Sequence, residues 1–168
     1  MGAVDTVGSP MASAVRTAMW LDRTAELAQV ALGIFGFDAG GRPIMIRPIS
    51  VGDSLLGRRR IAGMNGDGGT KLAPSLRAAV DALHATQAQR KVLIVIHDGH
   101  LDAQDALDVR QMCCKQLAQQ GIHLVPLYLG NDAAIIQANT QVFGTVLACA
   151  DLGQMSAKLC SWFRASGA

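Results

Sequence analysis

The pattern of apolar and polar positions predicts strands that alternate with helices along most of the chain. Residues 91–96 form a continuous Val/Ile/Leu run, typical of a strand buried on both faces of a parallel sheet. Apolar residues at helical spacing predict helices over 11–32, 72–86, 102–120, 132–138 and 152–164, and further apolar runs predict strands at 122–129 and 143–149. This order favours an α/β fold with a Rossmann-like, doubly wound, mostly parallel sheet flanked by helices.

Two shorter apolar runs, at 34–37 and 43–49, predict a hairpin because the sequence Asp-Ala-Gly-Gly at 38–41 separates them. Pro43 and Pro48 favour an edge position for the second run, since proline cannot donate a backbone hydrogen bond. Residues 51–69 are rich in Gly and Arg and are interpreted as a loop.

Size and composition indicate one domain, residues 1–168, with a sizeable core, because half of the 168 residues are apolar. The net charge is +2, and the single basic run, 58–60, has no interleaved aromatic residues, so nucleic-acid binding is not indicated. No apolar run approaches the ~20 residues that cross a bilayer, and the N-terminus lacks a signal-peptide layout. We therefore expect a soluble, cytoplasmic protein that does not bind membranes.

The cysteines favour a reducing compartment. Cys113, Cys114, Cys149 and Cys160 form no C-x-x-C pair, so neither a zinc site nor a disulfide framework is indicated. Reduced thiols are the expected state in the cytoplasm.

Oxygen-bearing side chains occur in three predicted loops, each beside glycines. Asp5 and Ser9 precede the first helix, Asp67 and Thr70 precede the second, and Asp98 follows the buried strand. In doubly wound sheets ligands bind beyond the carboxyl ends of the strands. Carboxylates and hydroxyls are the hard oxygen ligands that Mg²⁺ prefers.

These segments resemble the metal-ion-dependent adhesion site (MIDAS) of von Willebrand factor A (VWA) domains. That site combines D-x-S-x-S, a Thr after Gly-Gly, and an Asp-Gly after a hydrophobic strand. Residues 92–99 and 121–127 carry the strongest likeness. Residues 65–68 and 151–159 look most like the VWA subunit of cobaltochelatase and similar proteins, which implies a partner among AAA+ ATPases of the MoxR type.

The resemblance implies a set of metal ligands. Asp5 and Ser9 would be first-loop ligands, Thr70 the second-loop ligand, with Asp67 as its competitor, and Asp98 the third-loop ligand of Mg²⁺, Mn²⁺ or Ca²⁺. Val7 occupies the place of the family's first serine, so the site is degenerate. Only four residues precede Asp5, so we expect the first strand to be incomplete, or residues 1–10 to be truncated or rearranged.

The leading functional hypothesis is a non-catalytic protein-interaction module in which the cation accepts a carboxylate from a partner protein. Two alternatives stay open. One is an assembly subunit with a vestigial metal site and a surface for homo-oligomerisation; the other is a metal-assisted phosphohydrolase, which lacks a recognisable general base. His97 and His100 flank the candidate site and are interpreted as ordinary loop-edge residues, and residues 63–71 lack the spacing of a phosphate-binding P-loop.

Overall fold

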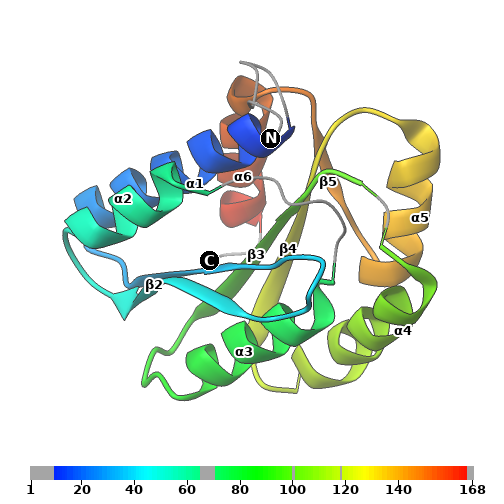
Figure 1. The fold of residues 1–168 in the computed structure, drawn as a ribbon, viewed down its shortest axis with the longest axis horizontal. Coiled ribbons are helices and arrows are strands. Elements are labelled where there is room, and N and C mark those ends of the chain that lie inside the picture. The colour runs from blue at the N-terminus through cyan, green and yellow to red at the C-terminus, as the bar shows by residue number, and fades with distance from the viewer. Residues whose placement is uncertain (1–9, 65–70, 100, 118, 166–168) are drawn as a thin grey trace. The chain divides into compact units, whose positions relative to one another are not determined.

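The computed structural model describes residues 10–64, 71–99, 101–117 and 119–165. Its chain divides into a first unit, Met1–Leu83, and a second unit, His84–Ala168. Figure 1 labels most of the elements of both. Each unit is described by itself, so the expected single domain over 1–168 stays a prediction.

The first unit is built from an antiparallel hairpin and helices. The hairpin is confirmed: β1 (Leu32–Gly36) pairs with β2 (Ile44–Ser50), from Leu32 opposite Ser50 to Gly36 opposite Ile44. The helices are α1 (Pro10–Leu27), α2 (Leu55–Ala62) and α3 (Ala73–His84), whose last residue begins the second unit. The start of α3 is held to the hairpin because the Ser75 hydroxyl donates to the Gly36 carbonyl at 3.0 Å.

Helix α1 ends at Leu27, earlier than the predicted residue 32. Residues 28 and 29 form a turn in which Gln29 adopts a φ of 55°. The chain is thereby redirected into β1, so the apolar residues at 30–32, counted as helix from their spacing, belong to the connection and the strand.

The prediction of a loop over 51–69 was wrong at α2. Ser54 caps this helix, since its hydroxyl accepts a hydrogen bond from the Gly57 amide at 3.0 Å. Gly57 and Ile61, four residues apart, form its buried face. A Cβ at Gly57 would lie 2.5 Å from the Ser54 hydroxyl oxygen and 3.3 Å from Cβ of Arg47, so glycine permits the close approach of α2 to β2.

A small apolar core joins the elements of the first unit. Ala18 of α1, Ile46 of β2 and Ile61 of α2 are buried together. The partly buried residues packed around them are Val15, Met19, Ile34 and Met64. Helices α1 and α2 therefore cover the same side of the hairpin, which fixes the relative positions of all four elements.

A network of ion pairs connects the same elements beside this core. Asp22 of α1 and Arg47 of β2 are both fully buried and form a salt bridge. Arg47 Nη2 also donates to the carbonyls of Ser50 at 3.2 Å and Gly52 at 2.8 Å. These bonds give both terminal nitrogens of the buried guanidinium a partner, while Nε has none among the described residues. The pairing offsets the cost of removing two charges from water.

Arg58 of α2 extends this network toward the surface. Its guanidinium lies 2.9 Å from the Glu26 carboxylate and 3.4 Å from that of Asp22, and it also pairs with Asp53. Hydrogen bonds from Arg23 and Arg58 hold the pKa of Glu26 below its ordinary value. The network thus joins α1, α2 and the connection between β2 and α2.

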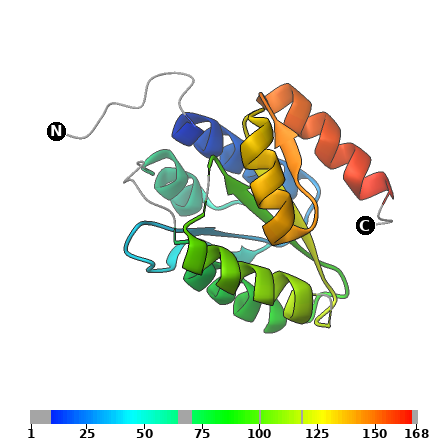
Figure 2. The same cartoon turned by 90° about the vertical axis from the view of Figure 1, so that its right-hand side faces the viewer.

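The second unit contains a parallel three-stranded sheet with the order β3-β4-β5. Its elements in chain order are β3 (Lys91–His97), α4 (Ala103–Gln111), the π-helix η1 (Met112–Leu117), β4 (Ile122–Leu129), α5 (Ala133–Phe143), β5 (Leu147–Cys149) and α6 (Leu152–Ala165). Strand β3 is in register with β4 from Lys91 opposite Ile122 to His97 opposite Tyr128. In Figure 2, β5 (orange) runs between α5 (yellow) and α6 (orange to red).

These observations confirm the α/β class and the parallel strands expected from residues 91–96 and 122–129. The predicted strand at 143–149 was too long, because α5 continues to Phe143 and Gly144, with a φ of 84°, ends it. Residues 1–9, on which the expected incomplete first strand depends, lie outside the described residues. Within the described part of the chain, every helix is too short or too polar to cross a membrane.

The buried Asp22–Arg47 pair gives the first testable prediction. Asp22→Ala leaves the Arg47 guanidinium buried without its carboxylate, so the free energy of unfolding should fall by about 3–5 kcal/mol. Urea-induced unfolding measures the change. Arg23→Gln is the control, because Arg23 pairs with Glu26 on the exposed surface, where its loss should change stability little.

A second variant separates buried charge from packing. The double variant Asp22→Leu/Arg47→Met removes both charges, so it should be more stable than Asp22→Ala. Equal stabilities of Asp22→Ala and the wild type would contradict this account of the network.

Candidate functional site

Asp98 is the one predicted metal ligand that the described residues include. It lies in a bend directly after β3, and its side chain is exposed. Asp5, Ser9, Asp67 and Thr70 lie outside the described residues, so their convergence on Asp98 stays a prediction. In the described ranges, no group of three or more His, Cys, Asp or Glu side chains is arranged to hold a metal ion.

The loop that carries Asp98 is held by two buried side chains. His97 Nδ1 lies 3.2 Å from the Gly99 carbonyl oxygen, and Asn139 Nδ2 of α5 donates to the same oxygen at 3.3 Å. Asn139 is 1% exposed and His97 is 4% exposed. A carbonyl that accepts two hydrogen bonds inside the protein fixes the backbone on both sides of Asp98.

His97 is enclosed by aromatic rings. Its ring centroid lies 5.8 Å from that of Tyr128 on β4 and 5.6 Å from that of Phe143 on α5. Burial lowers the pKa of His97, against weaker opposing effects of the Gly99 hydrogen bond and the Asp98 charge. The imidazole is therefore neutral at pH 7, and it carries its proton on Nδ1 if that atom donates to Gly99.

This placement refines the interpretation of His97 as a loop-edge residue. The ring points into the protein at the end of the strand, and Nε2 is buried without a hydrogen-bond partner among the described residues. Its visible role is to position the loop rather than to meet solvent. His100 lies outside the described residues.

Helix α5 supplies Asn139, which sequence reasoning missed. Asp132 caps the helix by accepting hydrogen bonds from the amides of Ala134 at 2.8 Å and Ile135 at 3.2 Å. Asn139 and Phe143 are four residues apart, so they share the face that meets His97. The predicted helix ended at residue 138, so this spacing was not considered. The sequence feature that could have identified Asn139 is its position one helical turn before Phe143.

The two aspartates between β3 and α4, Asp98 and Asp102, have different roles. Asp102 caps α4, since its carboxylate accepts a hydrogen bond from the Asp105 amide at 2.8 Å. The Asp98 carboxylate forms no hydrogen bond or ion pair with another described side chain. Asp98 is therefore the carboxylate on this loop that is available to an external cation or to a donor group.

Comparison with known proteins identifies the fold. No protein-family model matches the chain, and no curated protein matches it. Among solved structures, the VWA domain of SpRpn10 matches with a TM-score of 0.61 and 10% sequence identity, covering 83% of this chain and 75% of that one. At this identity the likeness establishes the fold alone: the chain has a VWA-like α/β fold, as the sequence predicted, while the degenerate MIDAS and the cobaltochelatase type stay predictions.

The buried His97 predicts a dependence of stability on pH. Because its pKa is lower in the folded state than the ordinary value of about 6.5, the unfolded chain binds the proton more readily. This contribution to stability is complete above about pH 6.5 and is lost as the pH falls toward the folded-state pKa.

The measurement is urea unfolding in chelator between about pH 7.5 and about pH 5. Wild type should lose more stability over this range than His97→Gln. His123→Gln is the control, because His123 is exposed on β4 and its variant should follow the wild type. Parallel curves for wild type and His97→Gln would show that His97 is not the responsible group.

The hydrogen bond from Asn139 predicts a local effect on the Asp98 loop. Asn139→Ala should lower the free energy of unfolding by about 1–2 kcal/mol and speed hydrogen exchange at the Asp98 and Gly99 amides. Gln104→Ala, which removes an exposed hydrogen bond to Asp108 of 3.0 Å, should leave both unchanged. Unchanged exchange in Asn139→Ala would mean that the loop is held by other contacts.

Proposed function

We propose that this chain is a divalent-cation-dependent protein-interaction module without catalytic activity. The observation that supports the proposal is an exposed carboxylate, Asp98, on a loop whose backbone is fixed by two buried side chains, His97 and Asn139. The loop lies at the carboxyl end of a parallel strand, where ligands bind in α/β sheets. Because the backbone of the loop is already fixed, little backbone entropy is lost when Asp98 binds a cation.

In this proposal Asp98, Thr70, Ser9 and Asp5 hold the cation, with Asp67 as the alternative to Thr70. The donor set of carboxylates and hydroxyls suits a small hard ion, so Mg²⁺ fits best and Mn²⁺ next, while Ca²⁺ requires more oxygen ligands. The bound ion would supply an electrophilic position for a carboxylate of the partner protein. The residues of this chain would position the cation and leave one of its coordination positions open for the partner's carboxylate.

The non-catalytic part of the proposal is supported by the orientation of His97. A metal-assisted phosphohydrolase needs a base that reaches the attacking water. The described histidine nearest to Asp98 is buried and directs Nδ1 at a backbone carbonyl, so it does not serve as that base.

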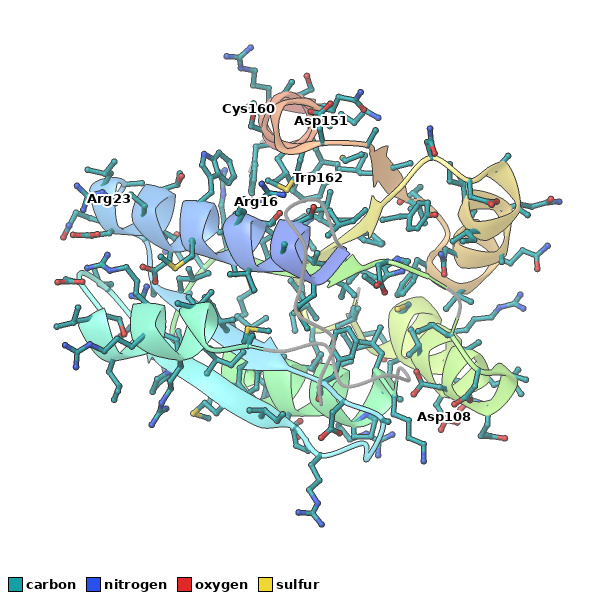
Figure 3. The ribbon with its side chains drawn as sticks, turned by 45° about the horizontal axis from the view of Figure 1, so that its top comes forward. Arg16, Arg23, Asp108, Asp151, Cys160 and Trp162 are labelled. Carbon is teal, nitrogen blue, oxygen red and sulfur yellow. The ribbon has the colours of Figure 1, made fainter. Side chains whose placement is uncertain are left out.

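A MoxR-type AAA+ ATPase is the proposed class of partner, on the resemblance of residues 65–68 and 151–159 to the cobaltochelatase VWA subunit. Asp151 caps α6 through the Gln154 amide at 2.8 Å, and Met155 and Leu159 are buried. Figure 3 labels Asp151 at the start of α6. Several residues at 151–159 that resemble the cobaltochelatase subunit therefore have structural roles in α6. The resemblance alone does not identify the partner, so a direct binding test is needed.

The alternative is an assembly subunit with a vestigial metal site. Val7 favours it, because a valine side chain has no oxygen to offer where the family has a serine. The two proposals differ in whether the chain binds a cation at all.

Metal binding through Asp98 is tested by thermal unfolding. Saturating Mg²⁺ or Mn²⁺ should raise the melting temperature of the wild type, since an ion at 100 times its Kd stabilises the folded state by about 2.7 kcal/mol. Asp98→Ala should abolish the increase. Asp108→Ala is the matched control, because Asp108 lies on α4 of the same unit, as Figure 3 shows, and should respond like the wild type.

Partner binding is then measured with Mg²⁺ present throughout, comparing wild type and Asp98→Ala for capture of a MoxR-type ATPase. This comparison avoids chelating the ion that the ATPase itself needs. Equal capture by both proteins would reject a metal-bridged contact. A wild type that binds no cation but self-associates in light scattering would favour the assembly alternative.

A further inference from the structure

Large apolar side chains are exposed at one end of the first unit. Leu27 is 70% exposed, Leu55 is 58% exposed and Leu56 is 61% exposed. Val30 and Val51 are also more than half exposed. We call these five residues, with Arg59 and Arg60, the leucine–arginine surface. Exposed apolar groups gathered in one place indicate a binding surface more often than single exposed ones do.

Ion pairs and strand pairing bring these residues together although they come from three segments. Glu26, the neighbour of Leu27, pairs with Arg58 at 2.9 Å, which places the end of α1 beside the first turns of α2. Leu32 is opposite Ser50 in the hairpin, so the chain just before β1 and the chain just after β2 lie side by side. Arg58 also pairs with Asp53, which closes the connection from β2 onto α2.

The geometry of α2 explains why its leucines point outward. Gly57 and Ile61 define the buried face of the helix. With 3.6 residues per turn, Leu55, Leu56 and Arg59 fall on the remaining faces, away from Gly57 and Ile61. Neither leucine contributes to the core of the unit, so the fold does not explain why they are apolar.

The charges at this end are unbalanced. Five arginines meet three carboxylates; the arginines are Arg23, Arg47, Arg58, Arg59 and Arg60, and the carboxylates are Asp22, Glu26 and Asp53. All three carboxylates are paired with arginines inside the network. Arg59 is exposed and forms no ion pair with any described residue, so positive charge remains beside the leucines.

We propose that the leucine–arginine surface docks an acidic amphipathic segment of a partner protein. Apolar side chains of that segment would cover Leu55 and Leu56, and its carboxylates would pair with Arg59 and Arg60. The surface shares no residue with the proposed metal site and needs no cation.

A protein segment suits this surface better than a lipid membrane. Asp53 is 58% exposed in its side chain and Glu26 is 21% exposed. Because both carboxylates pair with Arg58, the arginines of this surface without an ion pair among the described residues are Arg59 and Arg60, fewer than the roughly four to eight basic residues typical of surfaces that bind anionic headgroups. A peptide can place its acidic residues opposite Arg59 and Arg60 without bringing them close to Glu26 or Asp53.

The test uses a fluorescent helical peptide of about 18 residues, with leucines at positions i, i+3 and i+4 and glutamates between them. Fluorescence anisotropy measures its binding to the whole chain. The double variant Leu55→Gln/Leu56→Gln and the single variant Arg59→Gln should each weaken binding about tenfold or more. Raising the salt from about 50 to about 300 mM should also weaken binding to the wild type.

Two variants are matched controls. Leu107→Gln replaces a leucine that is 55% exposed on α4, and Arg16→Gln replaces an exposed arginine of α1 that is labelled in Figure 3. Both should bind the peptide like the wild type. Circular dichroism and melting temperature check that every variant is folded.

Several results would overturn the proposal. These are no binding of the peptide at millimolar concentration, equal binding by the Leu55/Leu56 variant, or binding to anionic vesicles in preference to the peptide. A wild-type dimer that Leu55→Gln/Leu56→Gln dissociates would assign the surface to a second copy of this chain instead. Asp98→Ala and chelator should leave peptide binding unchanged, so failure here and failure of the metal-site proposal are distinguishable.

Discussion

The first unit depends on the salt bridge between Asp22 and Arg47, because it places two opposite charges where no water reaches them. Such a pair adds little net stability compared with apolar residues, but each partner requires the other. Helix α1 and strand β2 must therefore keep one relative position. The apolar contact of Ala18, Ile46 and Ile61 then brings α2 onto the same two elements.

This arrangement also determines what the first unit shows to solvent. Arg58 contacts the second carboxylate oxygen of Asp22 and reaches Glu26, so α2 turns the face of Gly57 and Ile61 inward. Leu55 and Leu56 are left outside, next to positive charge that the network does not neutralise. The proposed docking surface is thus a consequence of how the interior charges are satisfied.

The second unit solves a different problem, that of ending a partly buried strand with a loop of defined shape. Backbone carbonyls removed from water need donors, and the Gly99 carbonyl receives them from His97 and Asn139. Asp98 lies between His97 and Gly99 in the chain and is exposed. An exposed carboxylate on this loop supports the proposed metal site, and the two proposals together describe a module that contacts partners through two different sets of residues.

The sequence by itself determined the α/β class, the hairpin and the position of Asp98 after an apolar strand, which is partly buried rather than buried on both faces. These follow from local patterns: continuous apolar runs, turn residues and the place of a polar residue at the end of a run. The VWA-like fold was also predicted from the sequence, through resemblance of short segments, and is confirmed by a solved structure of 10% identity.

Tertiary structure decided the rest, because contacts between distant residues carry no local signal. Helix α2 is stabilised by a glycine that fits against β2, and a run rich in Gly and Arg was taken for a loop. The pairing of Asp22 with Arg47 joins residues 25 positions apart, and that of Asn139 with Gly99 joins residues 40 positions apart. Burial of His97 likewise results from rings on β4 and α5, since only packing brings those side chains around one imidazole.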